Sequence, residues 1–175
     1  MAAAARVIVT HGLGASTALI AQEAGVSNGS LFTYFETKAE LFNCLYLELK
    51  AAMASAALEG LPAGAELREK VFHIWSNWMR WSVSNPDKRR ALTQLAVSDD
   101  ITPTTRSAGQ KTMAPIAELL ERCRANGPMR TVSMGFVAAI MHSLAEATMD
   151  FITQDPANAD EHSRIAFEAL WRMLT

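Results

Sequence analysis

The sequence has few of the residues that disulfide frameworks, metal centres and common active sites need. Its two cysteines, Cys44 and Cys123, are far apart and do not follow a metal-ligand spacing. We therefore expect reduced thiols, no metal and no cofactor. A glycine-rich phosphate loop, a nucleophile elbow and a zinc-ligand motif are also missing, so little in the sequence supports catalysis.

Charged residues are also scarce. Only 19% of the 175 residues are Asp, Glu, Lys or Arg, half are hydrophobic, and the formal net charge is -2. This composition argues against a disordered tail and against a nucleic-acid binder that works through bulk positive charge. Any contact with DNA must therefore be local and depend on shape.

No apolar run suits a membrane span or a signal peptide. The longest weakly charged stretch, residues 131–153, contains His142, Glu146 and Asp150, and no charged region precedes the apolar N-terminus. We therefore expect a soluble cytoplasmic protein without a membrane partner.

The alternation of apolar and polar residues that marks a half-buried strand is missing, so the predicted fold class is all-α. Thr37-Lys38-Ala39-Glu40 is a capping-box pattern and predicts a long helix from Lys38 to a break at residues 60–62. Prolines and glycines then divide the rest of the chain. Further helices are expected near residues 64–84, 86–97, 103–126, 130–153 and 158–174.

Residues 16–38 have the pattern of a helix-turn-helix. Ser16 can cap a short helix, Gly25 can end it in a left-handed conformation, and Ser27 can open a second helix that ends near Glu36. A DNA-reading motif and a plain helical corner fit this spacing equally well. The residues expected to face inward are Ile20, Ala21, Ala24, Val26, Leu31 and Phe35.

The same segment resembles a known family. The residues that carry the resemblance are Ile20-Ala21, Ala24-Gly25-Val26-Ser27, Gly29-Ser30-Leu31, Tyr34-Phe35 and Lys38-x-Glu40-Leu41. Together they are similar to the N-terminal signature of the TetR family of ligand-responsive transcriptional repressors, over residues 4–46. The resemblance implies a three-helix DNA-binding domain at residues 1–46 and a helical ligand-binding and dimerisation domain at residues 47–175.

The resemblance also implies which residues contact DNA. Ser16 and Thr17, at a helix N-terminus, match positions that meet phosphate, although Ser16 could serve only as a cap. Tyr34 and Lys38 match positions that contact the DNA backbone, and Lys38 could instead be an ordinary first-turn residue. The positions that match the base-facing stretch are Asn28, Gly29, Ser30 and Thr33, and the alternative for Asn28 is a solvated surface role.

Several departures from the family pattern reduce the expected electrostatic contribution. Phe32 stands where the family usually has tyrosine, and Ala18 and Asn28 stand where many relatives have Arg or Lys. Lys38 is the only lysine or arginine between Gly12 and Leu49, so counterion release contributes little to affinity. The family's opening helix is only partly represented, and its basic arm would lie in residues preceding Met1 if such residues exist.

The helix expected at residues 64–84 is apolar over most of its circumference. Three tryptophans within seven residues leave flat faces that suit an apolar or aromatic ligand, and methionines on other helices can repack around a guest. Core filling is the alternative for each of them. The candidate ligand-contacting residues are Phe72, Trp75, Trp78, Met79, Met113 and Met141.

The two last helices predict a homodimer. Residues 131–153 are apolar on opposite sides, through Val132, Phe136 and Ile140 on one side and Val137 and Met141 on another. Such a helix needs cover on both faces, and a partner subunit could supply one of them together with the last helix. Two recognition helices would then read two half-sites of a palindromic operator in double-stranded DNA.

A repressor released from its operator by a small, largely apolar or aromatic effector is the function that these observations favour. The alternative is a helical small-molecule-binding protein without DNA binding, which the sparse positive charge leaves open. A di-iron enzyme would need Glu-x-x-His on two helices, and none occurs. His142, Glu146 and Asp150 form a polar stripe that could be a hydrated seam or, less simply, a metal or cation site. The effector, the operator and the regulated genes are not encoded in any motif.

Overall fold

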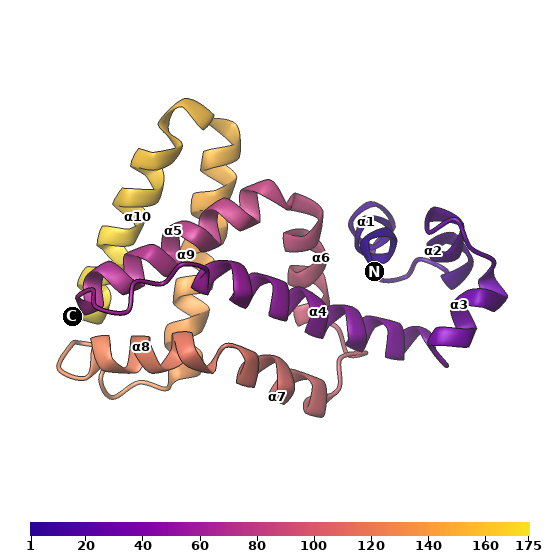
Figure 1. Cartoon of the computed structure of the whole chain (residues 1–175), viewed down its shortest axis with the longest axis horizontal. Helices are drawn as coiled ribbons and strands as arrows, with labels where there is room; N and C mark the ends of the chain where they lie inside the picture. Colours follow the sequence, from indigo (N-terminus) through magenta and orange to yellow (C-terminus); the bar gives the residue numbers. More distant parts are fainter. The chain divides into compact units, whose positions relative to one another are not determined.

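The computed structural model describes residues 1–175 and is helical throughout, which confirms the all-α fold class (Figure 1). It has ten α-helices, a short 3-10 turn at Pro156–Asn158, and no strand. The helices are α1 (Ala2–His11), α2 (Thr17–Glu23), α3 (Asn28–Tyr34), α4 (Lys38–Leu58), α5 (Leu67–Ser84), α6 (Pro86–Ala96), α7 (Pro103–Thr112), α8 (Ala114–Arg124), α9 (Met134–Gln154) and α10 (Ala159–Leu174).

Helix α4 begins and ends where its sequence predicts. The Glu40 amide donates to the Thr37 hydroxyl over 3.0 Å, whereas the Glu40 carboxylate accepts from the Glu36 amide, one residue earlier than in a reciprocal capping box. By length and composition α4 is also the one helix that could cross a membrane. A core helix of a soluble protein meets the same two criteria, so this finding is weak evidence for a span.

The single helix expected over residues 103–126 is wrong. The structure divides this segment into α7 and α8, with Met113 between them at φ -90° and ψ 0°. Pro115 explains the break, because it lacks an amide hydrogen and its ring crowds the carbonyl of residue 111. Helices α5 and α9 also begin later than expected, at Leu67 and Met134. The start of α9 is set by Ser133, which caps this helix by accepting from the Phe136 amide.

The chain forms two compact units. The first comprises residues 1–52 and 85–112, and the second comprises residues 53–84 and 113–175. Helix α4 therefore gives its first part to one unit and its last turns to the other. This division by packing differs from the sequence division after residue 46, which follows the DNA-binding motif alone.

In the first unit, α1 packs against α2 and α6, and α2 packs against α3. Asn43 of α4 holds the loop between α6 and α7. Its side-chain nitrogen donates to the carbonyls of Ala39 and Asp100 at 2.7 Å, and its oxygen accepts from the Thr102 amide at 3.0 Å. Both ends of the buried amide are thus satisfied. Large buried side chains of this unit are Ile8, Ile20, Leu41, Phe42, Leu45 and Leu95.

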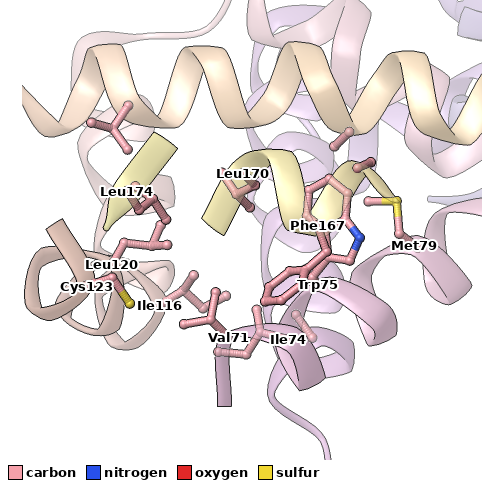
Figure 2. Packing of buried hydrophobic residues seen from close by; sticks show 14 of the residues in the cluster. Val71, Ile74, Trp75, Met79, Ile116, Leu120, Cys123, Phe167, Leu170 and Leu174 are labelled. Carbon is pink, nitrogen blue, oxygen red and sulfur yellow. The ribbon is translucent and has the colours of Figure 1, made fainter. Parts of the chain in front are cut away.

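The second unit is built around a core shared by α5, α8, α9 and α10. Figure 2 shows Trp75 and Phe167 close together, with Leu170 and Leu174 of α10 farther along the same core. Arg124, which is buried, binds both carboxylate oxygens of Glu121 and donates to the carbonyl of Met129 at 2.7 Å. These bonds fix the loop between α8 and α9.

Candidate nucleic-acid interface

Helices α2 and α3 are joined by a fully hydrogen-bonded turn. The Ser16 hydroxyl caps α2 by accepting from the Leu19 amide at 3.2 Å. At the other end, Gly25 has φ +70° and donates to the Gln22 carbonyl, while Val26 donates to the Ala21 carbonyl, both at 3.0 Å. These two bonds define a Schellman motif, in which glycine takes the left-handed position.

Helix α3 begins at the predicted cap. The Ser27 hydroxyl accepts from the Ser30 amide at 3.0 Å and shares a second hydrogen bond with the Ser30 hydroxyl at 2.8 Å. The predicted end near Glu36 is two residues too long, because α3 ends at Tyr34. Caps at both helix starts and a closed turn between them hold α3 in a fixed orientation on α2.

The inner side of the motif is narrower than predicted. Ile20, Ala21 and Leu31 are buried as expected, and Phe35 is half-buried. The placement of Ala24 and Val26 in the core is wrong, because Ala24 is exposed and 46% of the Val26 surface is accessible. Both flank Gly25, whose left-handed conformation turns the chain away from the core at this point.

The residues expected to read bases lie on exposed positions of α3. Asn28 is exposed and its carboxamide makes no hydrogen bond within the chain. The Thr33 hydroxyl donates to the Gly29 carbonyl at 3.2 Å, so one of its hydrogen-bonding capacities is used locally. Ser30 is engaged in the cap with Ser27. Asn28 therefore offers the freest donor and acceptor pair on this helix.

The residues expected to meet the DNA backbone differ in availability. Tyr34 is 79% exposed, and Thr17 opens α2 directly after the Ser16 cap. Lys38 instead donates to the Leu13 carbonyl at 2.6 Å, and its ammonium lies 5.2 Å from the centre of the Phe42 ring. Lys38 thus holds the start of α4 to the loop before α2.

Acidic side chains outnumber basic ones around the helix-turn-helix. Residues 1–46 contain two cations, Arg6 and Lys38, against three carboxylates, Glu23, Glu36 and Glu40. Arg6 forms an ion pair with Glu23 at 2.8 Å, in which both side chains are close to half exposed. Such a pair contributes little to stability, but it occupies one of the two cations nearest the motif.

The six candidate ligand-contacting residues all lie in the second unit. Trp75 and Met79 are buried in its core, and Trp78, Met113 and Met141 are partly buried against that core. Phe72 is 41% exposed and meets the Phe167 ring edge-on, with 4.8 Å between ring centres.

One contact that the sequence did not predict extends this group. Trp78 stands edge-on to Trp75 at 6.0 Å and stacks on the exposed His142 ring at 6.3 Å, with an interplanar angle of 17°. His142 was expected only in a polar stripe with Glu146 and Asp150, and no group of three or more His, Cys, Asp or Glu could hold a metal ion. The two rings meet only because α9 packs on α5, so no local sequence pattern predicts this stacking.

Helices α9 and α10 carry an exposed set of apolar side chains. Phe136 and Phe151 on α9 and Ile165 on α10 are each more than half exposed, whereas Val137 and Ala145 on α9 are fully buried. One of the two predicted apolar sides of α9 is therefore covered within the chain. The other side is covered only in part: Val132 and Leu144 pack against the core, whereas Phe136 and Phe151, together with Ile165, are exposed.

Both the sequence of the helix-turn-helix and the fold of the whole chain are similar to those of known proteins. Residues 1–45 match the family model described as "Bacterial regulatory proteins, tetR family". A chain from Shewanella sp. PV-4 assigned to that family has 25% identity and a TM-score of 0.85, with 97% of this chain and 92% of the other covered. A TetR family regulator from Marinobacter aquaeolei VT8 has 22% identity and a TM-score of 0.85, with coverage of 98% and 91%.

A more distant relative has been solved with a bound ligand. The transcriptional regulator FadR from Bacillus subtilis, in complex with stearoyl-CoA, has 16% identity and a TM-score of 0.70, with 99% of this chain and 96% of the other covered. At this identity the likeness concerns the fold alone. The helix-turn-helix geometry and the match over residues 1–45 show that the chain carries the N-terminal DNA-binding domain of TetR family transcription regulators, and the likeness over the whole length shows that it has the fold of such regulators.

Proposed function

We propose that this regulator is a repressor, which binds a palindromic operator as a homodimer and is released by a small, largely apolar or aromatic molecule. The observation that carries the proposal is α3, which is capped at its start, held to α2 by a closed turn, and exposes the unengaged carboxamide of Asn28. A rigid helix with free polar side chains is what direct readout in the major groove requires.

The exposed residues of α3 divide into two kinds of DNA contact. Asn28 can make paired hydrogen bonds to adenine, and the Thr33 methyl group can contact thymine, with Gly29 allowing close approach. Tyr34 can donate its hydroxyl to phosphate, and the free amides at Thr17 can do the same, which sets register without reading sequence. We assign the DNA-binding role to residues 1–46 and the effector and dimerisation roles to residues 47–175.

The test is selection of random duplex DNA by the purified protein, followed by binding of the enriched site at several salt concentrations. A palindromic site is the expected result. Failure of the protein to enrich any sequence would favour the second candidate function, a helical small-molecule binder without DNA binding, which the negative charge balance of residues 1–46 supports.

Replacing Asn28 with alanine is expected to weaken operator binding by about 1–3 kcal/mol, which is roughly 5- to 150-fold, and to relax preference at one base pair of each half-site. Fluorescence anisotropy with the enriched duplex and its single-base variants measures both effects. Asn126→Ala, at an exposed asparagine of the second unit, is the matched control and should change neither. Unchanged affinity in Asn28→Ala would remove Asn28 from the base-reading set.

The proposed homodimer uses the exposed apolar side of α9 and α10. Phe136, Phe151 and Ile165 expose large apolar surface that a monomer in water would leave uncovered. In a twofold interface each of these residues would contribute two contacts, one from each protomer. The two α3 helices could then meet two half-sites, which is the mechanical reason for a dimer.

A carboxylate at this surface is expected to break the dimer. Phe151→Glu should weaken self-association by about 2 kcal/mol or more, at least ~30-fold, because the buried ring is lost and a charge replaces it in each protomer. Sedimentation equilibrium at several concentrations measures the change from a dimer to the 19.1 kDa chain. Val97→Glu is the control, since Val97 is 81% exposed and belongs to the first unit. Equal association of both variants with the parent protein would place the interface elsewhere.

For the effector, the second unit offers aromatic and sulfur-containing surface. Trp78 and the stacked His142 ring present flat faces, and the partly buried Met113 and Met141 can adjust to a guest. Stearoyl-CoA in the Bacillus subtilis FadR structure shows that a related fold takes a ligand with a long apolar chain. This supports an apolar effector, and a regulator with this role acts in the cytoplasm.

Release would follow from the shared helix α4. This helix begins four residues after α3 and contributes to both units, so an effector that displaces it changes the separation of two α3 helices in a dimer. Coupling between the two sites is reciprocal, so operator DNA must weaken effector binding by the same factor. An effector that binds tightly without changing operator affinity would contradict this mechanism.

A further inference from the structure

Lys50 on α4 is a half-buried cation without an acceptor. Its ammonium forms no ion pair and no hydrogen bond, and its one polar contact is with the face of the Tyr46 ring, 5.8 Å from the ring centre. Burial alone lowers the pKa of Lys50, with no carboxylate nearby to oppose it.

Tyr46 gives this position a second polar group. The residue is only 5% exposed, its hydroxyl makes no hydrogen bond within the chain, and burial raises its pKa while the positive charge of Arg106 opposes that rise. The ring of Tyr46 is buried, but its hydroxyl is not among the polar atoms that are sealed from solvent without a partner, so it is a donor that an acceptor from solution can reach. Lys50, Tyr46 and Arg106 therefore place two free donors in a locally positive field.

Helix α7 is held tightly against this pair. A Cβ atom at Gly109 would lie 2.8 Å from Cε1 of Tyr46 and 3.5 Å from Cγ of Lys50, so only glycine lets the two helices approach this closely. The charged groups of α7 nearest this position are Arg106, which donates to the carbonyls of Ala96 and Ser98, and the exposed Lys111. Neither supplies a negative charge.

We propose that Lys50 and Tyr46 form a recognition position for an anionic oxygen group, a carboxylate or a phosphate, of a small-molecule effector. The inference rests on the proposed function, since the anionic group belongs to a small-molecule effector, and it is argued from the first unit alone. An anion at this position would supply the acceptor that both side chains lack and would offset the cost of holding the Lys50 ammonium away from water. All residues involved belong to the first unit.

The first experiment observes the lysine side chains directly. The full chain, labelled with ¹³C and ¹⁵N in lysine, is titrated with sodium acetate and, separately, with inorganic phosphate, against sodium chloride at equal ionic strength. Lys50→Met identifies the Lys50 resonance, and Lys111 serves as the internal control on α7. We expect a saturable shift of Lys50 with one of the two anions, a weaker response in Tyr46→Phe, and only a small linear change at Lys111.

Two results would overturn the proposal: a Lys50 response no larger than that of Lys111, or identical binding in the parent protein and Tyr46→Phe. The anion that saturates at the lower concentration distinguishes a carboxylate from a phosphate. Lys50→Met is expected to fold at least as stably as the parent protein, because it removes a desolvated charge, so loss of the fold does not confuse the comparison.

A second experiment separates this proposal from the proposed function. Decanoate and decanol, which share a chain and differ in charge, are compared for release of the enriched operator by the parent protein, Lys50→Met and Lys111→Met. Release by decanoate that falls at least tenfold in Lys50→Met alone supports both proposals. Release that is equal in all three proteins overturns the anion position and leaves the repressor intact. A saturable Lys50 shift without any release by decanoate supports anion binding and counts against release by such amphiphiles.

Discussion

Trp75→Ala is expected to lower the free energy of unfolding by about 4 kcal/mol, the range for an aromatic residue truncated in a core being ~3–5 kcal/mol. Trp75 is 2% exposed, packs edge-on against Trp78, and donates from its indole nitrogen to the Ser163 carbonyl at 3.1 Å. Its loss therefore leaves a cavity between α5 and α10 and removes the hydrogen bond to Ser163. Urea unfolding followed by circular dichroism at 222 nm measures the change.

Trp78→Ala is the matched comparison, one turn farther along α5. Trp78 is only partly buried, so its replacement should cost clearly less stability but should weaken effector binding more. The opposite result, with Trp75→Ala stable and deficient in ligand binding, would show that Trp75 lines a ligand cavity and is not a core residue. The pair thus decides which tryptophan belongs to the packing and which to the effector.

Gly127→Ala is expected to cost about 3 kcal/mol, because the loop between α8 and α9 meets the end of α10 without room for a methyl group. A Cβ at Gly127 would lie 1.8 Å from the Leu174 carbonyl oxygen and 2.7 Å from its carbon. These are backbone atoms, so the clash is relieved only by moving the end of α10 or the loop. The same unfolding measurement reports the loss.

Gly135→Ala is the control for the same substitution at an open position. Gly135 is exposed within α9, and its nearest atom would be the Ser133 hydroxyl oxygen at 3.9 Å. Because alanine is the better helix former by about 0.8–1.0 kcal/mol, this variant should be slightly more stable than the parent protein. Equal stability of Gly127→Ala and the parent protein would show that the last residues of α10 move aside at no cost.

Local sequence signals predicted the helix starts well. Ser16, Ser27 and Thr37 each cap a helix because a hydroxyl reaches an amide three residues later, a geometry that four consecutive residues determine. Gly25 ends α2 for the same local reason, since its positive φ closes a Schellman motif. Most of the DNA-binding motif could therefore be placed without tertiary information.

Side-chain burial was harder to predict, because it depends on what packs against each helix. Val26 fits an apolar anchor by composition, yet the left-handed turn at Gly25 leaves it 46% exposed. Lys38 matches a backbone-contacting position, yet it donates to the Leu13 carbonyl, which is 25 residues away in the sequence. The helix expected over residues 103–126 breaks at Met113, two residues before Pro115.

Longer-range contacts carried the least sequence signal. The stacking of Trp78 on His142 and the lack of an acceptor at Lys50 both depend on which residues of other helices lie nearby. A histidine, a tyrosine or a lysine on a helix has many possible surroundings, and spacing does not choose among them. The expected ligand-contacting residues therefore came from residue type, and their surroundings came from the fold.

The balance of charge around α2 and α3 has a consequence for how the regulator finds its target in a cell. With Arg6 paired to Glu23 and the Lys38 ammonium turned to a carbonyl, residues 1–46 give chromosomal DNA little general attraction. Non-specific DNA competes with an operator in proportion to that attraction multiplied by the number of competing sites. Few molecules would be held along the chromosome, so a small number of copies per cell would suffice to fill the operator.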